Sequence, residues 1–270
     1  MENVITSVQN PRIKQLLTLQ QKSSERRKTG LFVVEGQREL QHCIEAGLQI
    51  DTIFCCEEMA PNLSTFNFQL STVNCQLSTI YVSPYVYEKI AYRGSTEGII
   101  AVVKTPQRSL GDLSTAKKPG LYIVLESVEK PGNLGAVLRS ADAAGVNAVI
   151  VCDPLTDLYN PNLIRSSIGA IFTVPTVACT SEECISWLKQ HQIQILTAQL
   201  QDSHVYYDAD MCRPTAIVMG TESTGLSPIW REAADAHIRI PMLGRLDSLN
   251  VSVSAAILMY EAVRQQMTNN

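Results

Sequence analysis

Three short segments carry polar side chains where a loop follows a hydrophobic run. The first, residues 126–145 (ESVEKPGNLGAVLRSADAAG), holds Asn133 and Arg139 in the first turns of an expected helix. Because a guanidinium stays protonated, Arg139 is suited to stabilising a developing oxyanion or gripping a phosphate rather than to accepting a proton. The simpler interpretations are an exposed Arg139 paired with Asp142, and an Asn133 that only caps the helix.

The other two segments add glycines and small polar residues. Residues 218–227 (VMGTESTGLS) place Glu222 in a tight turn that begins at Gly220, and glycine lets a backbone approach a ligand closely. Residues 238–263 contain Ser248, a candidate N-cap, and Asn250, a poor helix former in the first turn of an expected helix. The chain has neither a G-x-G-x-x-G nor a G-x-x-x-x-G-K-[ST] motif, which argues against a dinucleotide or nucleoside-triphosphate site.

Alternating strands and helices would position these segments. The last 150 residues contain six strand candidates separated by helices: Leu121–Glu126, Asn147–Asp153, Phe172–Ala178, Gln194–Leu200, Thr215–Gly220 and His237–Pro241. This rhythm predicts an α/β domain with a mainly parallel sheet and helices on both faces. Ligands of such sheets bind beyond the carboxyl ends of the strands, so the loops after Glu126, Gly220 and Pro241 form the candidate site.

The first hundred residues predict a second, small α/β unit. Its expected helices are Pro11–Gln20, Gln37–Ala46 and Pro84–Ala91, and its expected strands are Leu31–Glu35, Ile50–Cys56, Ile80–Val82 and Gly98–Lys104. Periodicity lapses in a stretch rich in Pro, Gly, Ser and Lys that follows. We therefore expect a first domain over residues 1–104, a linker over 105–119 and a second domain over 120–267.

Composition limits the classes of protein. A chain of 270 residues with 45% hydrophobic and 18% charged residues can build real cores, and its net charge of −4 argues against binding polyanions with the whole surface. The charge is segregated, because the first forty residues carry +3 and the remainder −7. No apolar run is long enough to cross a membrane and no signal-peptide core is present, so we expect a cytoplasmic protein without a membrane partner. The eight cysteines lack metal-ligand spacing and are expected to be reduced, mostly buried, and free of metal.

The three polar segments together resemble a known family. They read N-x-G-x-x-x-R at Asn133–Arg139, G-x-E-x-x-G at Gly220–Gly225 and I-P-M-x-G-x-x-x-S-L-N at Ile240–Asn250. Their content, order and spacing resemble the motifs of the SpoU/TrmH-type RNA ribose 2′-O-methyltransferases of the SPOUT superfamily. LFVVEGQREL at 31–40 and STEGIIAVVK at 95–104 resemble the RNA substrate-binding extension of some members, which is similar to a ribosomal-protein fold.

The resemblance implies a fold and a cofactor. It implies a trefoil knot in the second domain, in which the last helix threads through a loop of the sheet, and a homodimer whose interface borders both active sites. It implies S-adenosylmethionine as the cofactor, held by the loops of the knot, with Gly220, Ile240 and Leu249 at the matching positions.

The resemblance also assigns roles to side chains. Arg139 matches the catalytic arginine, either as base or as electrostatic stabiliser. Asn133 and Glu222 would orient the arginine and the substrate, whereas Ser248 and Asn250 would shape the cofactor and ribose site.

RNA capture is expected to begin with positive side chains. Lysines and arginines suited to phosphate contacts gather near the N-terminus, at Lys22, Arg26, Arg27 and Lys28. Lys130 stands where many relatives have an acidic or polar residue, and it is a further candidate for an RNA phosphate. Ribosomal RNA is the favoured substrate and transfer RNA the second. The alternatives are a non-catalytic RNA-binding or ribosome-assembly factor on the same fold, and a conventional α/β enzyme with a nucleotide cofactor.

Overall fold

The computed structural model describes residues 4–60, 78–92, 97–114, 119–221 and 224–268. The chain forms two compact units, one of residues 1–107 with 158–169 and one of residues 108–157 with 170–270. The sequence-based division did not anticipate that 158–169 would leave the second unit. None of the helices in the described ranges is long and apolar enough to cross a membrane.

The first unit is a four-stranded sheet with helices. Its strand order is β1-β4-β2-β3, with β1 (Leu31–Glu35) and β2 (Ile50–Cys55) antiparallel to β4 (Ile99–Lys104), and β3 (Ser78–Tyr81) parallel to β2. Its helices include α1 (Pro11–Gln21), α2 (Ser23–Thr29), α3 (Gln37–Glu45), α5 (Pro84–Ile90) and a 3₁₀ turn, η1 (Glu57–Met59). Apolar side chains of α1 and α5 pack on one face of the sheet and form its core.

Helix α7 (Pro161–Ser166) joins this unit through specific contacts. The ring of Tyr159 stacks on Phe32 of β1 with centroids 4.5 Å apart. Arg165 donates from Nη1 to the carbonyl of Tyr92 at 3.0 Å, and the Tyr92 hydroxyl donates to Asn162 Oδ1 at 2.5 Å. These contacts explain why 158–169 belongs with the first unit despite its place in the chain.

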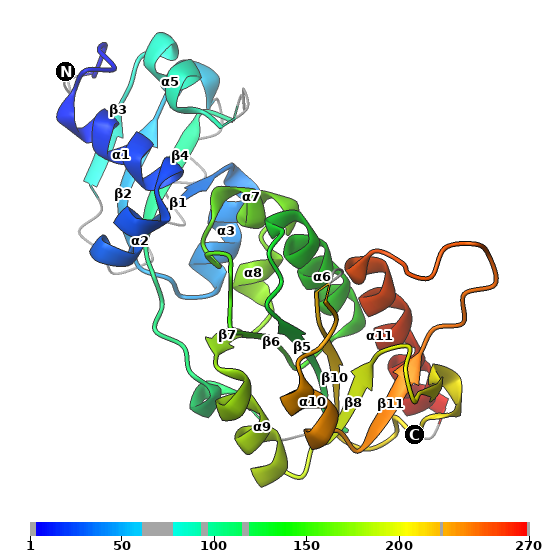
Figure 1. Ribbon diagram of the computed structural model, residues 1–270. Coiled ribbons are helices and arrows are strands. Elements are labelled where there is room, and N and C mark those ends of the chain that lie inside the picture. The colour runs from blue at the N-terminus through cyan, green and yellow to red at the C-terminus, as the bar shows by residue number, and fades with distance from the viewer. Residues whose placement is uncertain (1–3, 61–77, 93–96, 115–118, 222–223, 269–270) are drawn as a thin grey trace. The chain divides into compact units, whose positions relative to one another are not determined.

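The second unit contains a fully parallel sheet (Figure 1). Seven strands of the described residues follow the order β7-β6-β5-β10-β8-β11-β9. Their bounds are β5 Leu121–Glu126, β6 Ala148–Cys152, β7 Thr176–Cys179, β8 Gln194–Ala198, β9 His204–Val205, β10 Thr215–Met219 and β11 Ala236–Arg239. The predicted α/β class with a mainly parallel sheet is confirmed, although the two-residue strand β9 was not predicted.

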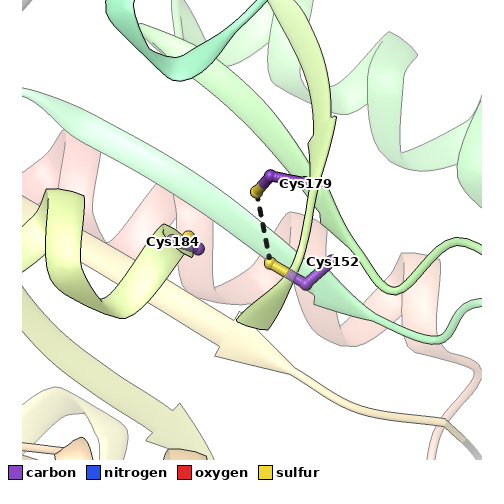
Figure 2. A group of neighbouring side chains, drawn as sticks. All are labelled: Cys152, Cys179 and Cys184. Carbon is purple, nitrogen blue, oxygen red and sulfur yellow. Dashed lines mark hydrogen bonds between the residues drawn. The ribbon is translucent and has the colours of Figure 1, made fainter. Parts of the chain in front are cut away.

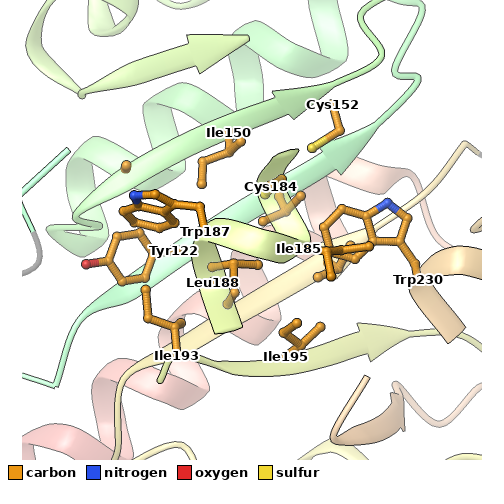
Figure 3. Close-up of a cluster of buried hydrophobic side chains, with 14 of the residues drawn as sticks. Tyr122, Ile150, Cys152, Cys184, Ile185, Trp187, Leu188, Ile193, Ile195 and Trp230 are labelled. Atoms are coloured by element: carbon orange, nitrogen blue, oxygen red, sulfur yellow. The ribbon is translucent and has the colours of Figure 1, made fainter. Parts of the chain in front are cut away.

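Helices cover both faces of this sheet. On one face α6 (Pro131–Ala144) and α11 (Val251–Thr268) pack against each other and against the strands, and α8 (Ala170–Thr173) packs on α6. On the other face α9 (Ser181–Gln190) and α10 (Pro228–Ala233) bury apolar side chains against the strands, including Trp187 next to Tyr122 and Trp230 farther along (Figure 3). Two 3₁₀ turns, η2 (Leu110–Asp112) and η3 (Tyr206–Asp208), complete the described elements.

Three local predictions were wrong. The expected strand Phe172–Ala178 is divided, because α8 ends at Thr173 and β7 begins only after Pro175, and proline disfavours helix in the residue before it. Asn133 does not cap α6, since Pro131 is already its first residue, a position that suits the fixed φ of proline. Ser248 does not cap α11 either; Asn250 does, because its Oδ1 accepts from the backbone N–H of Ser252 at 3.0 Å.

Candidate active site

A cavity of about 370 Å³ lies beyond the carboxyl ends of β8, β10 and β11. The strand order changes direction between β5 and β10, because β6 and β7 extend the sheet on one side of β5 whereas β10, β8 and β11 extend it on the other, and the cavity borders this point through the loop after β10. Ligand sites of parallel sheets occur at such a point. The lining residues that the sequence predicted are Gly220, Ile240, Ser248 and Leu249.

The loop after β10 folds tightly onto itself. Thr221 and Gly225 form an isolated bridge, the N–H of Gly225 donates to the Thr221 carbonyl at 3.1 Å, and the hydroxyls of Thr221 and Thr224 lie 2.7 Å apart. A Cβ on Gly220 would lie only 2.2 Å from the Gly225 carbonyl oxygen, and Gly225 has a φ of +68°. Both positions therefore require glycine, and a backbone loop forms this wall of the cavity.

A buried carboxylate holds the far end of that loop. Glu126, the last residue of β5, is 7% exposed and accepts from the backbone N–H of Ser227 at 2.8 Å and from its hydroxyl at 2.5 Å. The hydroxyl of Ser181 accepts a hydrogen bond from the indole N–H of Trp230 at 3.0 Å and donates one to Asp153 Oδ2 at 2.6 Å. Sequence reasoning missed Glu126 and Ser227 as positioning residues, because the motifs contain the loop but not its anchors.

A smaller cavity of about 170 Å³ shares Gly220, Thr221 and Val251 with the first. Its other lining residues include Lys130 and Asn133, from the loop after β5 and the start of α6. Asn250 Nδ2 donates to Asn133 Oδ1 at 3.2 Å. The structure thus brings together the first and third motifs, which lie 117 residues apart in the chain.

Arg139 lies apart from both cavities. It is exposed on α6, does not line either cavity, and its side chain has no hydrogen bond or ion pair within the described parts of the chain. The alternative pairing with Asp142 is absent there, since Asp142 accepts from the Thr173 hydroxyl at 2.6 Å. Glu222 lies outside the described residues.

The predicted RNA-contact residues divide into two kinds. Lys22, Arg27, Lys28 and Lys130 are exposed to solvent. Arg26 is only 4% exposed, and its Nη1 donates to the carbonyls of Leu19 at 2.5 Å and Gln20 at 3.1 Å. Its guanidinium satisfies C-terminal carbonyls of α1 and is buried, so it is not offered to an RNA phosphate.

The loop after β8 contributes residues that sequence reasoning missed. Gln199, Leu200 and Gln201 line the larger cavity. Gln199 Oε1 is buried and accepts no hydrogen bond within the described ranges. Ligands of parallel sheets bind beyond the carboxyl ends of strands, and this rule applies to the loop after β8 as well. The sequence did not single out this loop, because only the strand order shows that β8 lies next to β10.

Known proteins are similar in sequence to this chain over nearly its whole length. Residues 120–260 match the SpoU rRNA Methylase family, and residues 10–101 match an MRM3-like substrate binding domain. A 23S rRNA (uridine(2479)-2'-O)-methyltransferase of Streptomyces viridochromogenes is 31% identical over 98% of this chain and 93% of its own length. The 23S rRNA (guanosine(2553)-2'-O)-methyltransferase RlmP of Bacillus subtilis is 28% identical over 95% of this chain and 97% of its own.

Solved structures agree. An AdoMet-bound rRNA methyltransferase from Sinorhizobium meliloti has a TM-score of 0.88 to this chain at 27% identity, with 97% of each chain covered. The resemblance drawn from the three motifs is confirmed, and the chain belongs to the SpoU rRNA methylase family.

Proposed function

We propose that this protein transfers a methyl group from S-adenosylmethionine to a ribose 2′-hydroxyl of 23S ribosomal RNA. The observation that carries the proposal is the pair of cavities that share Gly220, Thr221 and Val251, each lined by motif residues. A methyl donor in the larger cavity and a ribose at the smaller one can meet where the two cavities adjoin. Relatives aligned over nearly the full chain are named as 23S rRNA 2'-O-methyltransferases.

The larger cavity fits S-adenosylmethionine. Its volume of about 370 Å³ lies within the range of small-molecule sites, roughly 300–1,000 Å³. The backbone of Gly225 and Leu226 occupies the space that a Cβ on Gly220 would need, so this wall of the cavity offers backbone groups to a ligand. Gln199 Oε1 is a buried acceptor that a ligand amino group or hydroxyl can satisfy. We assign Gly220, Ile240 and Leu249 to cofactor contact, with Ser248 shaping the same site.

Side chains of this protein would assist the reaction of the ribose 2′-hydroxyl. Bound S-adenosylmethionine supplies the electrophilic methyl group. A ribose hydroxyl is a poor nucleophile while it keeps its proton, so Arg139 would stabilise the developing alkoxide and grip the adjoining phosphate. Asn133 and Asn250, already hydrogen-bonded to each other, would position the ribose at the smaller cavity. Glu222 would orient the arginine.

The exposed position of Arg139 is compatible with a site completed by a second copy of the chain. Helix α11 supports this, because Val253, Tyr260 and Met267 recur every seven residues and leave an apolar stripe exposed. We therefore propose a homodimer through the second unit. Tyr260→Glu should convert it to a monomer in size-exclusion chromatography with light scattering and lower methyl transfer, and an unchanged dimer would reject this face.

The trefoil knot implied by the family is also proposed for this chain. After β11, residues 240–250 lead into α11, which returns across the sheet to pack on α6, β5 and β10. This return supports a last helix threaded through a loop of the sheet, an arrangement rare among folds.

The first unit would capture the RNA. Lys22, Arg27 and Lys28 of the α1–α2 region supply phosphate contacts, and Lys130 supplies another beside the smaller cavity. We favour ribosomal RNA over transfer RNA because of the match to a substrate binding domain, and we place the enzyme in the cytoplasm with that RNA.

Incubation with a tritiated methyl donor tests the activity. We expect label in 23S rRNA transcripts, and not in transfer RNA, at one 2′-hydroxyl that primer extension can map. The relatives modify both uridine and guanosine, so mapping identifies the base. Cofactor binding without transfer to any cellular RNA would favour the non-catalytic factor instead.

A further inference from the structure

Three cysteines from separate parts of the chain meet at one edge of the parallel sheet. Cys152 ends β6, Cys179 ends β7 as its partner in register, and Cys184 lies on α9 (Figure 2). Their Sγ atoms all lie within 4.8 Å of one another, and those of Cys152 and Cys179 are 4.0 Å apart. Chain spacing gave no sign of this cluster, which only the strand order assembles.

The three cysteines differ in their exposure to solvent. Cys152 and Cys184 are fully buried, whereas Cys179 is partly exposed and offers a path for entry. The thiolate is the form of cysteine that binds metals.

The sulfur separations match a shared metal ion better than a disulfide. With metal–thiolate bonds of about 2.3 Å, sulfurs around one ion lie roughly 3.8–4.0 Å apart. Cys152 and Cys179 already have that separation, and Cys184 is within about 1 Å of it. A disulfide would require the two sulfurs to close to about 2.05 Å.

The number and type of ligands restrict which metal ion can bind. Among the described residues no His, Asp or Glu joins the three sulfurs as a fourth ligand. Structural zinc is almost always four-coordinate, whereas soft thiolate sites also select Cu(I). The apolar side chains around Cys152 and Cys184 leave little access for a coordinating water. We propose that Cys152, Cys179 and Cys184 form a three-sulfur site for Cu(I).

Copper binding to the reduced, full-length protein tests the site. Under anaerobic conditions, competition with a chromophoric Cu(I) chelator should show one tightly bound ion per chain, and X-ray absorption at the copper edge should show three sulfur ligands. Since losing an outer-shell partner costs about 10–100-fold in metal affinity, loss of a ligand in Cys179→Ser should cost at least about 100-fold. Cys212→Ser is the matched control, because Cys212 is also partly exposed but lies outside the cluster.

Thermal unfolding separates binding from folding. Cu(I) should raise the Tm of the wild-type protein and of Cys212→Ser, but not of Cys179→Ser. If copper-free Cys179→Ser unfolds early, Cys179→Ala serves as the second variant. Equal copper affinity in the Cys179 and Cys212 variants, a site with fewer than three sulfurs, or tighter binding of Zn(II) than of Cu(I) would each overturn the assignment.

Discussion

Replacing Gly220 with alanine tests whether the cofactor wall is set by backbone contact. The new Cβ would lie 2.2 Å from the Gly225 oxygen and 2.6 Å from the Leu226 nitrogen. To restore an ordinary contact, the backbone of residues 225–226 must retreat by about 1.2 Å, and overpacking of this kind costs about 1–3 kcal/mol. If that cost falls on cofactor binding, Kd rises by about 5- to 150-fold, because each 1.4 kcal/mol is tenfold.

Isothermal titration of S-adenosylmethionine into the purified protein measures this change. Gly244→Ala is the matched control, since a Cβ there meets nothing within 4 Å and the residue lies in the loop that leads into α11. We expect Gly244→Ala to bind within about twofold of the wild type, because an uncrowded surface substitution changes free energy by no more than about 0.5 kcal/mol. A Gly220→Ala variant that binds as tightly as Gly244→Ala would refute the backbone-contact reasoning.

Three further predictions concern single side chains. Arg139→Ala should lower methyl transfer by at least about 100-fold while cofactor affinity stays nearly intact; near-normal turnover with a tritiated donor would reject its role. Ser227→Ala removes one donor to a buried carboxylate and should lower the free energy of unfolding by about 1–3 kcal/mol, measured by urea denaturation. Arg26→Met should destabilise the fold by a similar amount at unchanged RNA affinity, whereas Arg27→Met should weaken RNA binding at unchanged Tm. Anisotropy titrations with labelled RNA at two salt concentrations separate these last two variants.

Continuous apolar runs made the strands predictable. Leu31–Glu35 and Leu121–Glu126 have the expected bounds, because a buried strand reads as an unbroken series of branched and aromatic residues. The run Ile171–Val174 is also mostly apolar, yet Ile171–Thr173 belong to helix α8, and periodicity alone cannot separate helix from strand over so few residues. Pro175 marks the boundary that the hydrophobic pattern conceals.

Neighbours that come from distant parts of the chain were not predictable. Three such contacts are the hydrogen bond between Asn133 and Asn250, the cysteine cluster, and the stacking of Tyr159 on Phe32. Each depends on the strand order or on the packing of segments that are remote in sequence. Single-residue reasoning instead assigned capping to Asn133, which the helix start at Pro131 overrules.

Motifs were readable where the backbone restricts the residue type. Gly220 tolerates no Cβ and Gly225 has a positive φ, so the backbone of this chain by itself requires glycine at both positions. A positive charge in the sequence predicts less about function than such a glycine does. Arg26 and Arg27 are adjacent and chemically identical, yet only Arg26 is buried, with its guanidinium hydrogen-bonded to carbonyls at the end of α1. Counting basic residues therefore overstates the charge offered to RNA. Arg139 is a third case, since a fixed charge on an exposed helix face acquires a role only from the groups placed against it, here the RNA or the proposed second copy of the chain.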